Sequence, residues 1–391
     1  MNILFIMTMS FSPFKGGVQN VTWKLGKHFT EHGMNVSYLS MAGEGHMEPE
    51  YGKLYYNAAN ESTSSNMEGY IHGVLNEVRP DIVINQGPYE RELQIILSGA
   101  KDKYGYKLVG CLHNSLYSFK SNAKDKVREQ LSGIKQKLAV SRPGMAAVHT
   151  YHYLKHRRDL KRILDSHDVF VLLTPSNREE LEHFVGGYKS EKVRAIPNSI
   201  PSVHPYGKKK KKLLYVGRLN ITQKRADLLL PVWRELHEKL TDWEFVIVGD
   251  GPEKEKIDRT IRELNLPRVT TTGRQNPESY YSEASIFVMP SAYEGFPLVI
   301  LESQSHGVVP VAFNSYLALP WIVNDGKDAL LEVPFNVNGM AKKIAELVAD
   351  RDRLEAMGRA AIRNAEKFTV DRVGEQWFGF FDEMLQHERT K

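Results

Sequence analysis

Glu294 and Glu302 are the residues whose type and spacing most clearly suggest chemistry. Both follow the apolar run Ile286–Met289, and Gly295 and Pro297 predict a turn that leads into a helix. The free N–H groups at the start of such a helix favour an anion such as a diphosphate. Glu302 would lie about two turns beyond Glu294, so one carboxylate can address a sugar at the helix start while the other reaches the vicinal hydroxyls of a ribose. The alternative interpretation is a solvated turn and a surface glutamate.

Two cations form a second candidate group. Arg218 follows the apolar run Leu213–Val216, and Lys224 lies six residues later. An arginine at the C-terminal end of a strand and a lysine across the next loop can neutralise a leaving diphosphate without a metal ion. Taken alone, such residues are more often simply solvated. Their position at a strand end, as for Glu294, favours the binding role.

The N-terminal half offers two glycines and a histidine. Gly16 and Gly17 join the first apolar run to an amphipathic stretch and would let a ligand approach the backbone, although a plain turn explains them equally well. Neither a dinucleotide fingerprint nor a Walker loop is present. His113 ends the apolar run that begins at Leu108, so we expect its side chain at the edge of a sheet; a structural histidine is the alternative.

The sequence argues against metal sites and disulfides. Cys111 is the only cysteine, so neither an internal disulfide nor a cysteine cluster can form, and a reducing compartment is expected. Three histidines fall at helical spacing, but the basic residues that follow them would repel a cation; they are His149, His152 and His156. We therefore predict no metal site and no cofactor.

The elements that must position these residues alternate along the chain. Short apolar runs separated by amphipathic stretches of helical length are typical of parallel strands joined by helical crossovers. Strands are predicted at Ile3–Met9, Val36–Leu39, Asp81–Asn85, Leu108–His113, Val169–Thr174, Val193–Ile196, Leu213–Val216, Phe245–Val248, Val269–Thr272, Ile286–Met289, Val308–Ala312 and Ala329–Glu332. The predicted fold class is α/β, with two Rossmann-like doubly wound domains facing a cleft.

Composition and charge set the expected domains and surroundings. A Pro-containing segment around 196–201 and a lysine run separate a domain at 1–200 from one at 201–369, and an aromatic-rich stretch at 370–391 should pack as a helix toward the first domain. The first apolar run is far shorter than the ~20 residues of a membrane span, so a cytoplasmic location is expected. The net charge of +5 is modest, but basic residues cluster at Lys208–Lys212 and Lys120–Arg162, which suggests a local anionic partner.

Together these segments resemble the retaining glycosyltransferases of family four, which have the GT-B fold. The order and spacing of several motifs carry the resemblance: Gly16-Gly17-Val18, Ile196-Pro197-Asn198-Ser199-Ile200, Val216-Gly217-Arg218-Leu219 with Lys224, Val248-Gly249-Asp250-Gly251-Pro252, and Glu294 through Glu302. The resemblance implies that Arg218 and Lys224 bind a donor diphosphate, Glu302 its ribose, and Glu294 and His113 the transferred sugar. The other residues implied in donor binding are Gly16, Gly17, Arg274, Gln275, Gly295, Phe296, Leu298 and Val299.

The resemblance implies metal-independent transfer, with retention, of a hexose from a nucleotide diphosphate sugar. UDP-hexose is the first expectation and GDP-mannose the second, and the acceptor would be a saccharide or lipid-linked saccharide of cell-surface polysaccharide synthesis. The alternatives are a sugar-nucleotide epimerase or hydrolase of the same fold, or a non-catalytic donor-binding subunit. Nucleic acid is not an expected partner.

Two departures from the family pattern bear on the acceptor. Ser315–Trp321 replaces the usual Gly-Gly with its Pro-Glu, and Asp328-Ala329 replaces the usual Asn-Gly, which leaves the acceptor geometry open. The basic stretch Lys120–Arg162 matches the region where relatives often touch anionic membranes. Peripheral contact with the inner face of the cell membrane is therefore expected, with a solvated helical face as the alternative.

Overall fold

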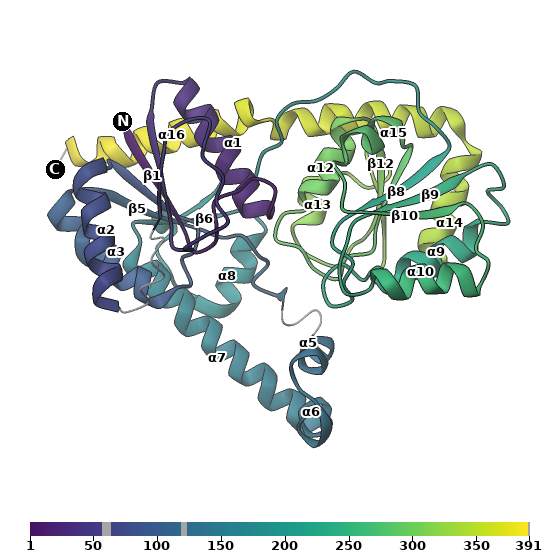
Figure 1. Ribbon diagram of the computed structural model, residues 1–391, viewed down its shortest axis with the longest axis horizontal. Coiled ribbons are helices and arrows are strands. Elements are labelled where there is room, and N and C mark those ends of the chain that lie inside the picture. The colour runs from purple at the N-terminus through teal and green to yellow at the C-terminus, as the bar shows by residue number, and fades with distance from the viewer. Residues whose placement is uncertain (57–63, 119–122, 390–391) are drawn as a thin grey trace. The chain divides into compact units, whose positions relative to one another are not determined.

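The computed structural model describes residues 1–56, 64–118 and 123–389, which form two compact units. The N-terminal unit comprises Met1–Asn114, Tyr153–Pro201 and Val370–Lys391, and the C-terminal unit comprises Ser115–His152 and Ser202–Thr369. In each unit, helices surround a parallel sheet (Figure 1). The α/β class and the Rossmann-like character of both domains are therefore confirmed.

The sheet of the N-terminal unit has seven parallel strands in the order β3-β2-β1-β4-β5-β6-β7. The order reverses between β1 and β4, which defines a switch point where α/β proteins bind ligands beyond the carboxyl ends of the strands. The strands are β1 (Asn2–Met7), β2 (Asn35–Ser40), β3 (Lys53–Tyr56), β4 (Ile82–Asn85), β5 (Lys107–Cys111), β6 (Val169–Leu172) and β7 (Val193–Ala195). Because most residues of the central strands are buried, these strands read as continuous apolar runs.

The helices of this unit bury one apolar face each. In α1 (Gly17–Glu31) the buried face includes Val21, Leu25 and Phe29, and Gly33 follows the helix with a φ of 81°, a left-handed conformation that glycine tolerates at a helix C-terminus. The other helices are α2 (Ser64–Val78), α3 (Arg91–Tyr104), α8 (Asn177–Val185) and α16 (Val370–Arg389).

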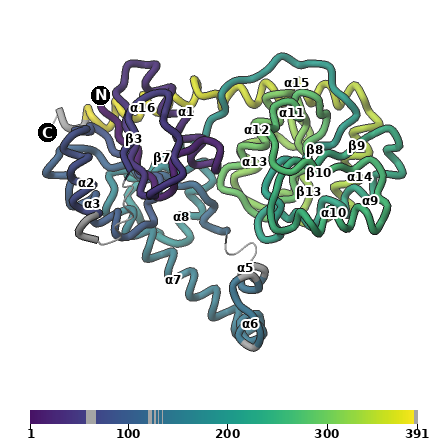
Figure 2. Tube along the Cα trace, in the orientation of Figure 1, coloured from purple at the N-terminus to yellow at the C-terminus, as the bar shows by residue number. Residues whose placement is uncertain are grey.

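The last helix of the chain, α16, lies alongside α1, the first one (Figure 2). Phe29 of α1 packs against three aromatic rings of α16, with ring centroids 6.3 Å from Trp377, 5.6 Å from Phe378 and 5.4 Å from Phe381. Burial of these rings is a large hydrophobic contribution. The core of the N-terminal unit therefore includes the far end of the sequence.

The sheet of the C-terminal unit repeats the same plan. Its six parallel strands have the order β10-β9-β8-β11-β12-β13, which places a switch point between β8 and β11. The strands are β8 (Lys212–Val216), β9 (Glu244–Val248), β10 (Val269–Gly273), β11 (Ile286–Met289), β12 (Val309–Phe313) and β13 (Leu330–Glu332). The helices are α9 (Leu229–Leu236), α10 (Lys254–Glu263), α11 (Glu278–Glu283), α12 (Leu298–Ser305), α13 (Leu319–Ile322), α14 (Val337–Ala349) and α15 (Arg351–Ala365).

The C-terminal unit also includes Ser115–His152, a segment from the N-terminal half of the sequence. Helices α5 (Ala123–Gln130) and α6 (Gly133–Val140) and the start of α7 (Arg142–Ser166) group with the C-terminal unit. They share a small cluster of buried side chains that includes Val127 and Met145, separate from the main cores. Since the boundary falls inside α7, a cut based on sequence position alone could not find it.

The structure also corrects the strand prediction at one place. Each predicted run contains or overlaps an observed strand, but β3, at the edge of the N-terminal sheet, was not predicted. Its four residues, Lys53–Tyr56, are exposed or half-buried, so they lack the apolar run that marks a central strand.

Candidate functional site

The candidate residues of the C-terminal unit come from the two loops that follow β8 and β11. These strands are neighbours at the switch point, with Ile286 paired to Leu213 and Phe287 to Leu214. Because both strands run in parallel, the loops that follow them emerge at the same edge of the sheet. A direct backbone hydrogen bond joins the two loops, from the Ala292 amide to the Gln223 carbonyl, at 2.7 Å.

Glu294 and Lys224 meet between these loops as a largely buried ion pair. Lys224 Nζ lies 2.7 Å from Glu294 Oε1, and the side chains are only 17% and 7% exposed. The side-chain amide of Gln223, through Nε2, donates to the other carboxylate oxygen, Oε2, at 3.1 Å. A pair so far removed from water costs desolvation energy that its attraction only partly returns. An arrangement of this kind is more typical of a functional site than of a device for stability.

The loop that carries Lys224 is held in place by the side chain of Asn220. Its Oδ1 accepts hydrogen bonds from the backbone amides of Lys224 at 2.8 Å and Gln223 at 3.3 Å. The next residue, Arg225, has a φ of 49°, a conformation that non-glycine residues adopt at some cost. The backbone is therefore set so that Lys224 and Gln223 both address Glu294.

Arg218 is exposed at the end of β8, on a backbone that runs close against the loop after β9. A Cβ atom added to Gly249 would lie 1.9 Å from the carbonyl oxygen of Gly217, and one added to Gly251 would lie 2.4 Å from that of Leu219. These glycines therefore permit the close approach of two backbone segments. They thus support the loop that carries Arg218.

Helix α12 begins after Pro297 and carries the second glutamate, Glu302, which is half-buried. The hydroxyl of Tyr281, on α11, donates to Glu302 Oε2 at 3.4 Å. At the start of the helix the Leu298 amide already donates to the Phe296 carbonyl at 3.0 Å. One of the N–H groups that we expected to bind an anion at the start of this helix, that of Leu298, therefore already makes a hydrogen bond within the protein.

The remaining predicted residues of this unit differ in exposure. Gly295 and Phe296 are buried, Leu298 and Val299 are half-buried, and Arg274 and Gln275 are exposed directly after β10. The strand order places β10 at the edge of the sheet, two strands from β8. Arg274 and Gln275 therefore start from the edge strand, whereas the Lys224–Glu294 pair lies at the switch point.

Two buried hydroxyl groups lie in the same region without a protein partner. Among the described residues, neither Ser291 Oγ nor the Tyr316 hydroxyl finds a hydrogen-bond partner. Burial, with the nearby Glu294 carboxylate, raises the pKa of Tyr316 well above its usual value, so the phenol stays protonated. Ser315 Oγ donates to the Ser291 carbonyl at 2.6 Å, which places the segment that departs from the family pattern against the loop of Glu294.

In the N-terminal unit the candidate residues follow β1 and β5. A side chain on Gly17 would meet nothing within 4 Å, whereas one on Gly16 would lie 2.7 Å from Gln19 Oε1. Packing therefore does not explain the glycine at position 17. His113 follows β5, and its Nε2 lies 2.5 Å from Gln86 Oε1, so this nitrogen carries a proton and donates. Burial lowers the pKa of His113 to about 4, and the imidazole is neutral at neutral pH.

The structure thus joins Lys224 and Glu294 directly and places Arg218 at the neighbouring strand end. Several residues that contact or lie near the predicted site residues were not predicted: Gln86, Asn220, Gln223, Tyr281 and Tyr316. A signal for Gln86 was available, because a polar residue directly after a central apolar strand lies where ligands bind. Gln223 and Tyr281 had no comparable signal, since their roles depend on contacts between separate elements.

The chain matches two family profiles that together span most of its length. Residues 15–202 match Glycosyltransferase Family 4, and residues 198–364 match Glycosyl transferases group 1. The amylovoran biosynthesis glycosyltransferase AmsD of Erwinia amylovora is 24% identical over 375 residues, which cover 93% of this chain and 95% of that protein. An exopolysaccharide phosphotransferase of Streptomyces coelicolor is 29% identical over 222 residues. This match covers 56% of this chain and only 24% of that relative.

The solved structures extend the comparison to the fold. The structure of Anabaena HepE in complex with UDP and glucose superimposes with a TM-score of 0.71 at 15% identity, covering 98% of this chain and 99% of that one. The two family profiles and the likeness of fold together identify a GT-B glycosyltransferase. More particularly, the chain belongs to the glycosyl transferases of group 1. Within the described residues no helix is long and apolar enough to cross a membrane.

Proposed function

We propose that the protein transfers a hexose, with retention of configuration and without a metal ion, from UDP-hexose to a saccharide or lipid-linked saccharide. The buried Lys224–Glu294 pair at the switch point carries the proposal, because it holds a cation and a carboxylate where a nucleotide diphosphate sugar would bind. The unpartnered hydroxyls of Ser291 and Tyr316 add hydrogen-bonding groups suited to a sugar.

The chemistry follows from the charge that develops as the sugar leaves. Departure of the diphosphate gives an oxocarbenium-like sugar, and negative charge builds on the phosphate oxygens. Arg218, Lys224 and the start of α12 would stabilise that charge, each fixed donor contributing on the order of 3 kcal/mol. The acceptor hydroxyl would attack from the face that the diphosphate leaves, with the leaving phosphate taking its proton. The configuration is then retained.

Comparison with relatives supports the choice of donor and acceptor. HepE was solved with UDP and glucose, and AmsD is named for amylovoran biosynthesis. We extend both to this chain: UDP-hexose as donor and a growing cell-surface polysaccharide as acceptor. GDP-mannose is the second donor to test.

A peripheral contact with the inner face of the cell membrane belongs to the same proposal. The α5–α6 segment and the start of α7 expose basic residues, and Leu138 of α6 is 65% exposed. The basic side chains are Lys124, Arg128, Lys135, Lys137 and Arg142. Such charges each contribute about 1 kcal/mol near an anionic lipid surface. Lys120 of the predicted basic stretch lies outside the described residues.

The proposal is tested by incubating the purified protein with a panel of nucleotide sugars and lipid-linked saccharides, with and without EDTA. We expect UDP-hexose turnover that requires an acceptor, survives EDTA and yields a product whose anomeric configuration, read by NMR, matches the donor. Donor consumption without acceptor would instead indicate an epimerase or hydrolase. Donor binding without turnover would indicate a non-catalytic subunit. Co-sedimentation with anionic vesicles, compared with neutral ones, tests the membrane contact.

A further inference from the structure

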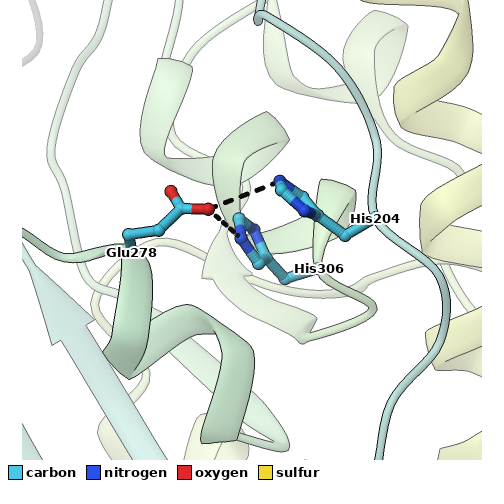
Figure 3. Close-up of side chains that lie close together, drawn as sticks. All are labelled: His204, Glu278 and His306. Atoms are coloured by element: carbon cyan, nitrogen blue, oxygen red, sulfur yellow. Dashed lines mark hydrogen bonds and ion pairs between the residues drawn. The ribbon is translucent and has the colours of Figure 1, made fainter.

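Three metal-ligating side chains meet at a place that the proposed transfer chemistry does not use. His204 comes from the segment that precedes β8, Glu278 is the first residue of α11, and His306 directly follows α12. Figure 3 shows the Glu278 carboxylate directed at both imidazole rings. The ligand atoms of the three residues all lie within 4.8 Å of one another. Three segments distant in sequence thus deliver a His-His-Glu set to one point.

One of the two distances from the Glu278 carboxylate to the imidazoles already fits the coordination sphere of zinc, and the other must lengthen by a few tenths of an ångström. Glu278 Oε1 lies 3.4 Å from His204 Nε2 and 2.9 Å from His306 Nε2. Ligands of a tetrahedral zinc, each about 2.0–2.2 Å from the ion, lie about 3.3–3.6 Å apart. The imidazole rings are stacked with centroids 4.0 Å apart, so they must splay to direct both lone pairs at one ion. The 42% exposure of the His204 side chain and the 57% exposure of Glu278 leave room for this adjustment.

His306 is held by the kind of outer contacts that orient a metal ligand. Its Nδ1 lies 2.9 Å from the Glu302 carbonyl oxygen, an acceptor that requires a proton on Nδ1. Nε2 lies 2.9 Å from Glu278 Oε1, a hydrogen-bond distance that requires a proton between the two atoms, so a metal ion bound here would replace that proton. A backbone carbonyl on the far ring nitrogen is a recurrent second contact of ligating histidines. The ring itself is only 5% exposed.

The other two ligands are also anchored through their backbones. The amide of His204 donates to the Ser305 carbonyl at 2.8 Å, which fixes this residue beside His306. The backbone amide of Glu278 donates a hydrogen bond to Asn276 Oδ1 at 3.2 Å, which holds this residue at the start of α11. Lys209, a cation close to His204, directs its ammonium at the Tyr281 and Ser282 carbonyls, 3.1 Å from each. The carboxylate is therefore left to face the two imidazoles.

We propose that His204, Glu278 and His306 bind a divalent transition-metal ion, with zinc as the best-matched ion. Two imidazoles and a carboxylate form a ligand set that zinc uses in proteins, and the exposed side of the cluster leaves a coordination position for water. This ion would not contact the donor diphosphate. It would tie the start of α11 to the end of α12, one turn from Tyr281 and Glu302, which hydrogen-bond to each other.

The test is a metal titration of the untagged full-length protein after removal of metals with EDTA. Zinc is titrated in competition with a chromophoric chelator, and cobalt is followed by its visible absorption, which reports coordination geometry. We expect one equivalent of zinc bound with micromolar or tighter affinity. His204→Ala and Glu278→Gln should each weaken binding by at least about 100-fold, more than the loss of an outer contact typically does.

Matched controls separate this cluster from other histidines and from unfolding. His237→Ala removes a histidine of the same unit outside the cluster, and the double variant His152→Ala/His156→Ala removes the helical pair on α7. Both should bind zinc as the wild type does. Zinc should raise the unfolding temperature of the wild type and not that of Glu278→Gln. Circular dichroism in EDTA checks that each variant folds.

Two results would overturn the proposal: no stoichiometric uptake by the wild type, or undiminished uptake by both His204→Ala and Glu278→Gln. The readouts do not depend on transferase activity. A protein that binds zinc here and transfers no sugar would contradict the proposed function alone, and one that transfers sugar without binding zinc would contradict only the metal site.

Discussion

Replacement of Lys224 by methionine removes the cation of the buried pair while keeping most of the side-chain volume. Glu294 is then a carboxylate only 7% exposed, with the Gln223 amide as its remaining described side-chain donor. Loss of one partner of a buried pair costs about 3–5 kcal/mol of folding free energy. Because Gln223 stays and the Lys224 side chain is 17% exposed, we expect the lower end, about 3 kcal/mol.

The same change should slow the chemical step. Loss of a fixed donor to the developing charge costs on the order of 3 kcal/mol of barrier, which corresponds to a decrease in kcat of roughly 100-fold. The double variant Lys224→Met/Glu294→Gln removes the uncompensated charge, so it should recover most of the stability and none of the activity. Urea unfolding and initial rates with saturating donor measure the two effects.

The double-mutant cycle makes this reasoning refutable. If Lys224→Met has the same urea midpoint of unfolding as the wild type, the two side chains do not depend on each other as a buried pair. If it is destabilised but keeps its kcat, Lys224 is structural and the diphosphate is stabilised by other groups.

Three further predictions concern single groups. Burial lowers the pKa of His167 to about 4, so between about pH 6.5 and pH 4 the unfolded state binds more protons than the folded state. Folding stability should therefore fall as the pH decreases through this range, by roughly 2 kcal/mol at pH 5 for this residue. In urea unfolding, His167→Gln should show a shallower fall. Gly249→Ala should fail to fold or lose several kcal/mol of folding free energy, because its Cβ would overlap the Gly217 carbonyl. Gly17→Ala should instead keep wild-type stability and bind donor more weakly. Equal stability of the two variants in thermal unfolding would contradict this contrast. Tyr281→Phe should raise the donor KM by roughly 2- to 10-fold, the value of one hydrogen bond, with kcat unchanged; a lower kcat in steady-state assays would show that this hydroxyl acts on the reacting centre instead.

The sequence predicted the fold well because parallel strands buried on both faces leave a plain signal. Runs such as Ile286–Met289 are apolar throughout, and the observed strand has the same bounds. β3 was missed because an edge strand needs no such run. The grouping of residues 115–152 with the C-terminal unit has a different cause: it depends on tertiary contacts, which no local pattern encodes.

For the candidate site, the sequence predicted which residues lie at strand ends but could not predict which other residues they contact. Glu294 and Lys224 could be placed at one sheet edge, but their direct pairing depends on the loop geometry set by Asn220. The expectation that no metal site exists rested on the single cysteine and on histidines at helical spacing, and the metal titration described above tests it. His204, Glu278 and His306 are brought together by the fold across about a hundred residues of sequence, so spacing could not reveal them.

The position of α16 has a consequence for synthesis on the ribosome. Phe29 is translated before Trp377 and Phe381, whose aromatic rings cover it, and most of the C-terminal unit lies between them in the sequence. Domains generally fold as units while the chain emerges. Here the first unit to be translated cannot complete its core until the second has been made, so the nascent N-terminal half must wait with an uncovered apolar face. A chain released before α16 is translated would keep that face exposed, which makes premature termination an aggregation hazard even though both sheets are present.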